Sequence, residues 1–444
     1  MLAQFTSAIG PFSPYWRGRL GALGVRASSV DSAAALRRLP AVAERDVCPG
    51  GDPAGAAALV LQVDEAGWAL HTSGPELRRG LGARLRGRDG AAAYRRQVEA
   101  ATRPTTYQFG GVGMVLPIAS TRRDLDVTAR AGARLWSVLG LGAADVLVSA
   151  VPVEQRLAHV ALSYAALGAG APGLFPGDDP LAVAETLRMV PATVLAVPAD
   201  GAGSAGGAGS AGNAVADLLE VADVPESVAT VLLVGGPTDS DRADVAGLLP
   251  GRRVLGVWGP PDGRVLYGES RAREGYVTYP DLEVLDVVDP DTGAAVRRGE
   301  GGELVLTQLG FRGSALVRWR TGTLMEAPIG TGPAPDGRTV PRLPSDLVAD
   351  GLVPLVELRG RLRPVDLRAV SGALAARTDL TAFRVDLEPD RARGAGEQAE
   401  RLVVRVAVLA GRDSRAAVDG AAAAVRSAAG VRPDRVLAEP GLLS

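Results

Sequence analysis

The stretch that decides the fold has three parts: Asp286-Val-Val-Asp-Pro-Asp-Thr-Gly293, Gly299-Glu-Gly-Gly-Glu-Leu-Val-Leu-Thr307 and Leu316-Val-Arg-Trp-Arg-Thr-Gly322. The Asp-Pro-Asp-Thr-Gly run is typical of a hairpin turn, because Pro presets one backbone angle and Gly tolerates a positive φ. The apolar and β-branched residues on either side favour strands. The sequence therefore predicts an antiparallel or barrel-like β region beyond Trp258.

Upstream of this region, β-rich runs alternate with helical patterns. Strands are predicted at 146–153, 193–197 and 229–234, and helices at 124–139, 158–167 and 181–189. Strands that alternate with helices of this length predict a mostly parallel sheet covered by helices. The predicted fold class is therefore α/β.

A chain of 444 residues is longer than a domain with a single hydrophobic core usually is, so two domains are expected. We expect residues 1–358 to form a large N-terminal domain of a nucleotide- or acyl-binding type. Residues 359–444 are expected to form a small α+β domain, because two strands, a helix and a last strand follow one another there. Residues 200–213 are almost wholly Gly, Ala and Ser, which predicts a flexible insertion.

Composition excludes several function classes. The net charge is -2 and the pI about 5.9, so no global basic field attracts nucleic acid. The first residues lack a secretory signal, which favours a cytoplasmic location. The uncharged stretch 157–177 contains Gly and Pro and is interpreted as a buried helix and turn, not a membrane span. A single cysteine, Cys48, and two distant histidines argue against a zinc site.

All 48 basic residues are arginine, and the chain contains no lysine. An excess of Ala, Gly, Arg and Val is typical of a GC-rich genome, in which arginine replaces surface lysines. Arginine cannot replace a lysine whose compact ammonium is needed at a reacting centre. Any reaction proposed for this chain must therefore work without a lysine at the reacting centre.

The three quoted parts closely resemble those of phenylacetate-CoA ligases, members of the adenylate-forming (acyl-CoA synthetase/AMP-ligase) superfamily. The family reads D-P-x-T-G, G-E-L-V-x-T and I-R-Y-R-T-x-D in the same order and at the same spacing, and the resemblance extends over nearly the whole chain. It implies a large nucleotide-binding domain and a small mobile C-terminal domain. It also implies ATP or AMP, Mg²⁺ and coenzyme A as cofactors, and a carboxylate or acyl-adenylate as ligand, because the family adenylates a carboxylate and transfers the acyl group to coenzyme A.

The family's phosphate loop reads S-S-G-T-T-G-K-P and precedes a helix that opens with T-x-x-D. Thr121-Arg-Arg-Asp124 matches that helix start, and the residues before it place Gly110 and Gly113 on the loop. The hydroxyl residues are absent, and Met114 takes the lysine position. The resemblance assigns the two glycines to nucleotide binding. The apolar residues around them favour a buried glycine turn instead.

The family carries G-A-E-P beside the adenine. Gly235-Gly-Pro-Thr238 stands at this place, so the resemblance assigns Gly235 and Gly236 to nucleotide binding.

The family's Y-G-x-(S/T)-E motif lies at the magnesium, and here it reads Val257-Trp-Gly-Pro-Pro-Asp262. The resemblance assigns Trp258 and Gly259 to nucleotide binding, with the indole in the stacking position. Asp262 is the candidate metal ligand in place of the glutamate. The alternative interpretation is a proline-fixed turn with an exposed aspartate.

The aspartate that closes the family's R-T-x-D accepts hydrogen bonds from the ribose, and Thr323 occupies its position here. A neutral hydroxyl is the weaker acceptor. Arg320 in the same motif and Arg361 in a hinge-like Arg-Gly-Arg are the candidate catalytic residues. The family's catalytic lysine lies in a tail resembling G-x-L-P-R-S-E-G-K-A-x-R. The expectation from the last residues, Glu439-Pro-Gly-Leu-Leu-Ser444, is a C-terminal domain without that tail.

Two functions remain open from the sequence. One is a divergent carboxylate-activating or acyl-transfer enzyme, in which arginines could have remodelled the site. The other is a non-catalytic pseudoenzyme that acts as a binding or assembly partner in a biosynthetic pathway. Because the missing cation, hydroxyl and carboxylate groups would act on one transition state, we expect the family's usual adenylation to be lost.

Overall fold

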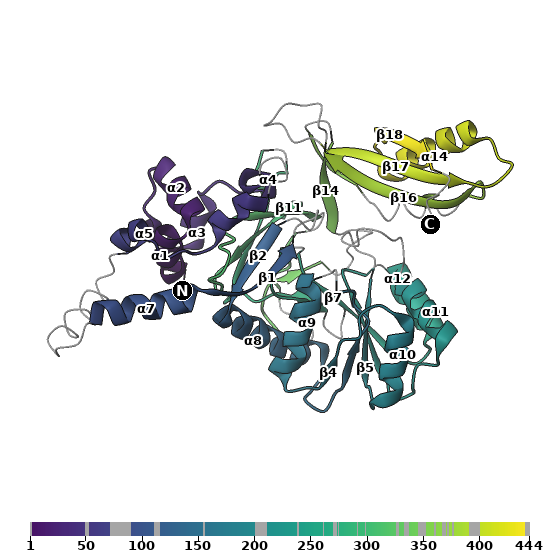
Figure 1. Cartoon of the computed structure of the whole chain (residues 1–444), viewed down its shortest axis with the longest axis horizontal. Coiled ribbons are helices and arrows are strands. Elements are labelled where there is room, and N and C mark those ends of the chain that lie inside the picture. The colour runs from purple at the N-terminus through teal and green to yellow at the C-terminus, as the bar shows by residue number, and fades with distance from the viewer. Residues whose placement is uncertain are drawn as a thin grey trace.

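The fold of the chain is given by a computed structural model (Figure 1). The residues that it describes are 2–48, 53–71, 90–110, 116–153, 156–199, 211–237, 239–260, 262–269, 273, 275–290, 292–297, 299–325, 328–332, 337–344, 352–358, 361–365, 370, 373–374, 377–389 and 400–439.

The central sheet has the strand order β13-β9-β8-β7-β6-β5-β3-β4. Its parallel part contains β4 (Gly173–Leu174), β3 (Leu147–Ser149), β5 (Val194–Pro198), β6 (Thr230–Val234) and β7 (Arg253–Trp258). An antiparallel edge follows with β8 (Tyr267–Glu269), β9 (Tyr276–Val277) and β13 (Arg342–Leu343). The predicted α/β class is confirmed.

Helices cover both faces of this sheet (Figure 1). Helices α8 (Arg122–Leu139) and α9 (Arg156–Ala169) lie on one face, and α10 (Pro180–Met189), α11 (Ala211–Val221) and α12 (Asp239–Leu248) lie on the other. Strand β5 shows why both faces are apolar. Val194 and Ala196 pack toward α8 and α9, whereas Leu195 and Val197 pack toward α10 to α12. This alternation buries the strand on both sides, as parallel sheets require.

The stretch quoted at the start contributes to three antiparallel strands, β10 (Glu283–Val288), β11 (Gly302–Gln308) and β12 (Trp319–Met325). Strand β14 (Leu352–Leu358) pairs antiparallel with β12 and extends this sheet. The predicted turn follows β10 directly: the Asp289 N–H donates to the carbonyl of Ala294, and Gly293 has a positive φ of 67°. Residues 294–301 then lead from this turn to β11. The three quoted parts also contact one another. The backbone N–H of Arg318 donates to Thr307 Oγ1 at 2.9 Å, and its Nη1 donates to Asp286 Oδ2 at 3.0 Å.

The N-terminal part is helical. It contains α1 (Leu2–Phe12), α2 (Pro14–Ala22), η1 (Ala27–Ser29), α3 (Ala33–Arg37), α4 (Glu44–Val47), η3 (Pro53–Leu59), α5 (Glu65–Leu70) and α7 (Gly90–Thr102). The hairpin of β1 (Pro104–Gly110) and β2 (Leu116–Thr121) follows. Apolar residues of these helices share one core with β2 and with residues 315–319. The helical segment therefore packs on the β region far along the chain.

The last part of the chain is an α+β unit of β15 (Arg361–Pro364), β16 (Leu380–Pro389), β17 (Glu400–Val408), α14 (Ser414–Ala429) and β18 (Arg435–Ala438). Asp413 caps the start of α14 by accepting from the backbone of Arg415, and Gly430 with a φ of 66° ends it. Strand β14 pairs with β12 and also with β15 and β17. The domain boundary at residues 358 and 359, which coincides with the end of β14, stays a prediction.

Two details differ from the sequence expectation. The strand predicted at 146–153 is shorter, from Leu147 to Ser149, and Pro152, which cannot donate to a ladder, lies beyond its end. Residues 200–210 of the predicted insertion lie outside the described part, but Ala211 already begins α11. The three final residues of the predicted insertion are therefore helical.

A glycine contact between α8 and α9 generates the first prediction. A Cβ added at Gly132 would lie 2.2 Å from the Cα of Ala165, a backbone atom that cannot move aside cheaply. We expect Gly132→Ala to lower the free energy of unfolding by about 1–3 kcal/mol through overpacking. Gly247→Ala is the matched control, because Gly247 is exposed in α12 with no atom within 4 Å of the added Cβ. Denaturant unfolding of both variants checks this, and equal stability would contradict the close packing.

Candidate functional site

Four of the nucleotide-binding candidates lie together at the carboxyl ends of β6 and β7, the edge at which open α/β sheets bind ligands. Gly235 and Gly236 follow β6 with positive φ values of 124° and 85°. The N–H of Gly235 donates to the carbonyl of Val257 at 2.9 Å, so the two strand ends are adjacent. Trp258 ends β7, and Gly259 follows, where an added Cβ would lie 2.7 Å from the carbonyl of Val265.

The indole of Trp258 packs into the protein's own core. It is 6% exposed, and its ring lies 6.1 Å from that of Tyr267 and 6.4 Å from that of Tyr276. These two tyrosines come from the antiparallel edge strands β8 and β9. The indole therefore already stacks on Tyr267, with an interplanar angle of 28°.

Asp262, the candidate metal ligand, is buried rather than exposed. The side chain is 2% exposed, and its Oδ2 accepts a hydrogen bond of 2.7 Å from Trp319 Nε1. The alternative interpretation of an exposed aspartate is therefore wrong. In the described ranges, no group of three or more His, Cys, Asp and Glu residues is placed to hold a metal. This carboxylate, as the structure arranges it, does not fit a magnesium site.

The two candidates on β12 also have partners within the chain. Arg320 Nε donates to Glu303 Oε2 at 2.6 Å, and its Nη2 donates to the carbonyl of Pro290. Thr323 is 8% exposed, and its hydroxyl lies 3.4 Å from the carbonyl of Thr321. The Arg320 side chain joins β12 to β11 and to the turn after β10, whereas the Thr323 hydroxyl contacts its own strand. The assigned roles of both residues stay predictions.

The remaining candidates belong to other parts of the fold. Gly110 is the last residue of β1, where its backbone pairs with Leu116. Gly113 and the neighbouring loop residues 111–115 lie outside the described residues. Arg361 begins β15, where its backbone pairs with Leu358, and its side chain is outside the described part. The structure thus brings together the candidates that follow β6 and β7. Gly110 and Arg361 lie on other strands, and Gly113 lies outside the described residues.

A buried arginine that the motif comparison missed lies two residues after Asp262. The guanidinium of Arg264 donates to Gln308 Oε1 at 2.8 Å, to the carbonyl of Ala119 at 3.1 Å and to that of Ser314 at 2.7 Å. It also stacks on Phe311 at 4.3 Å. Burial lowers the pKa of Arg264 to about 10, against the opposing effect of nearby carboxylates, so it remains charged at neutral pH.

Asp124 is the buried carboxylate that faces this cation. Its Oδ2 lies 3.7 Å from Arg264 Nη1 and accepts from the N–H groups of Thr121 and Gly313, at 2.8 and 2.7 Å. Its Oδ1 accepts from the N–H of Arg312 at 2.6 Å. The match of residues 121–124 to a helix start is confirmed, since Thr121 and Asp124 form a capping box at α8. The sequence pattern showed the cap but not its connection to residues 312–313.

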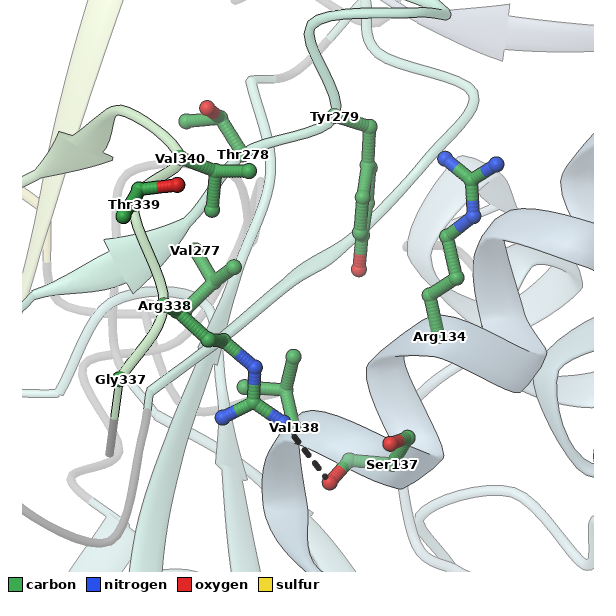
Figure 2. A pocket seen from close by; sticks show the side chains of 10 residues that line it. All are labelled: Arg134, Ser137, Val138, Val277, Thr278, Tyr279, Gly337, Arg338, Thr339 and Val340. Atoms are coloured by element: carbon green, nitrogen blue, oxygen red, sulfur yellow. Dashed lines mark hydrogen bonds between the residues drawn. The ribbon is translucent and has the colours of Figure 1, made fainter. Parts of the chain in front are cut away.

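A surface pocket of about 340 Å³ opens between the last turns of α8 and the segments 277–279 and 337–340 (Figure 2). Figure 2 shows Arg338 directed at the last turns of α8, where its Nη2 lies 3.4 Å from the carbonyl of Ser137. Arg134, on the other side, forms an ion pair with Asp281 at 2.6 Å. None of the sequence-predicted site residues lines this pocket.

Membrane association through a spanning helix finds no support in the described ranges. None of the helices there has the length and apolarity that crossing a bilayer demands.

The Asp124 contacts generate the second prediction. We expect Asp124→Ala to lower the free energy of unfolding by about 3–5 kcal/mol, because it leaves three amide N–H groups without their acceptor and the buried Arg264 guanidinium without its counter-ion. Asp126→Ala on the exposed face of the same helix is the matched control and should change stability by less than about 0.5 kcal/mol. Chemical denaturation measures both, and a small effect at Asp124 would show that the cation does not depend on it.

No protein-family model and no curated protein sequence matches this chain. Among solved structures, 2-hydroxyisobutyryl-CoA ligase in the postadenylation state, in complex with 2-HIB-AMP, has a TM-score of 0.61 at 17% identity. The match covers 99% of this chain and 85% of that chain. The same ligase in an open conformation, in complex with 2-HIB-AMP and CoA, has a TM-score of 0.58 at 16% identity over 100% and 87%. This chain therefore has the fold of the adenylate-forming CoA ligases.

Proposed function

We propose that the chain is a divergent, phenylacetate-CoA ligase-like protein that does not form acyl-adenylates from ATP and acts as a non-catalytic binding or assembly partner. The observation that carries this proposal is the bond between Asp262 and Trp319. Asp262, the carboxylate that the sequence assigns to magnesium, is buried and accepts from an indole at 2.7 Å. Exposing it to a metal would break this bond and leave the buried indole N–H without an acceptor, which costs about 1–3 kcal/mol.

The other retained polar groups support the same proposal. Arg320 forms an ion pair with Glu303, and the Thr323 hydroxyl lies beside a backbone carbonyl. Glu303 Oε1 accepts in addition from the N–H of Gly322, so the pair is fixed within the β11–β12 sheet. A transition-state cation must be preorganised toward the reacting phosphate. A guanidinium that is used to hold two strands and a turn together does not meet that requirement without rearrangement.

The absence of lysine adds an independent argument. Arginine can clamp a phosphate through its planar fork, but it does not reproduce a compact ammonium on a flexible stem. In the resembling family, lysines serve the phosphate loop and the adenylation step. Both would have to be replaced by groups of different shape, so the fold is retained without the chemistry.

Pyrophosphate exchange tests the proposal directly. With ATP, Mg²⁺ and a panel of aryl and alkyl acids, we expect no exchange above the background without protein. An active adenylate-forming ligase under the same conditions is the positive control. ATP-dependent exchange that disappears in Asp262→Asn would overturn the proposal, because it would show that this carboxylate serves the reaction.

A second candidate is acyl transfer from a preformed acyl-adenylate to coenzyme A. It is favoured by the presence of the α+β unit from β15 to β18 together with the large helix-covered sheet. This step needs no magnesium and no adenylating cation. Incubation with a synthetic acyl-adenylate and coenzyme A, without ATP, should then release AMP and thioester faster than the uncatalysed mixture. Equal rates would leave the binding function as the supported one.

A further inference from the structure

A buried carboxyl group lies where the parallel and antiparallel sheets meet. Glu283 begins β10 and is 3% exposed. Its Oε2 accepts from the hydroxyl of Tyr267 in β8, and its Oε1 accepts from Gln308 Nε2 at the end of β11 at 3.0 Å. One carboxyl group therefore links a strand of the central sheet to two strands of the antiparallel sheet. The candidate nucleotide site does not use it.

The contacts continue from Glu283 to the loop after β7. Gln308 donates to Glu283 with its amide nitrogen and accepts with its amide oxygen from Arg264 Nε at 2.8 Å. Arg264 is fixed in turn by two backbone carbonyls and lies two residues from Asp262, whose partner is Trp319. A change of charge at Glu283 thus acts on an unbroken hydrogen-bonded path to this loop.

The protonation state of Glu283 depends on its burial and on the charged groups around it. Arg264 and Asp124 face the cluster from the loop and from α8 and offset each other at 3.7 Å. Tyr267 and Tyr279 face it from β8 and from the segment after β9, and burial raises the pKa of both hydroxyls, so they stay neutral. Arg134 and Arg338 lie beyond Tyr279. Ionised Glu283 would therefore be an extra negative charge in a buried site.

Burial raises the pKa of Glu283 to about 7, while the hydrogen bonds from Tyr267 and Gln308 and the charge of Arg264 act in the opposite direction. Between its ordinary value and about 7, the folded protein holds this proton and the unfolded chain does not. Stability contributed by this group is therefore present at acidic pH and is lost as the pH rises through about 7.

We propose that Glu283 is a proton switch at the junction of the two sheets, whose charge state is transmitted through Gln308 and Arg264 to the loop that carries Asp262. On deprotonation, the O–H bond of the carboxyl breaks, the proton passes to water, and the carboxylate keeps the electron pair. The carboxylate then accepts from both Tyr267 and Gln308. The inference does not rest on the proposed function, because it concerns binding of a proton and not of a nucleotide.

Tryptophan fluorescence of the whole chain tests the switch, since Trp258 stacks on Tyr267 and Trp319 contacts the Asp262 loop. Between about pH 5 and pH 9, the wild-type signal should change with one midpoint near pH 7. Glu283→Gln should remove this transition. Tyr267→Phe should move the midpoint to higher pH, because it removes a donor that stabilises the carboxylate.

The two histidines supply the control, since imidazoles ordinarily change charge in this range. The double variant His71→Asn/His159→Asn should keep the transition. A transition that persists when Glu283→Gln is made in this folded histidine-free double variant, or a transition that disappears with the histidines alone, would overturn the proposal. If Glu283→Gln does not fold, Tyr267→Phe decides the matter alone, and a midpoint that stays in place or moves to lower pH contradicts the switch.

Discussion

The packing of β2, β11 and the 311–314 loop against one another depends on one buried cation, the guanidinium of Arg264. Arg264 bonds to β2 through Ala119, to β11 through Gln308 and to the 311–314 loop through Ser314. A guanidinium without acceptors at such a place would be far too costly to keep ionised. Its surroundings must therefore supply carbonyls, an amide oxygen, an aromatic face and Asp124 in fixed positions. Segments more than a hundred residues apart in sequence are held in register by that requirement.

The same constraint explains why the candidate site differs from its sequence description. The loop after β7 is held from inside the protein by Arg264, and Asp262 is turned toward Trp319. Residues that a motif comparison assigns to ligands thus serve as internal partners.

Much of the fold could be predicted from the residues. The run from Val194 to Val197 predicts a strand that is buried on both sides, and Thr121 with Asp124 predicts a capped helix. Both patterns can be recognised because they depend only on residues that are neighbours in the sequence. The antiparallel region followed from the Asp-Pro-Asp-Thr-Gly turn. The partners of Asp262, Arg320 and Glu283 could not be predicted, since Trp319, Glu303 and Tyr267 reach them only through strand pairing and sheet packing. Asp262 in particular is buried, whereas the two prolines before it suggested a turn with an exposed aspartate.

Strand β14 carries a consequence for how the chain can be divided. Its residues 352–354 pair with β12, and its residues 355–358 pair with β15 and, at Leu358, with β17. Cutting the chain before β14 would strip β12 of its outer neighbour, and cutting after it would leave its bonds to β15 and β17 unmade. Either fragment would expose an unpaired strand edge, a surface on which separate molecules join into larger assemblies. The two units are thus safest from aggregation when made as one continuous polypeptide.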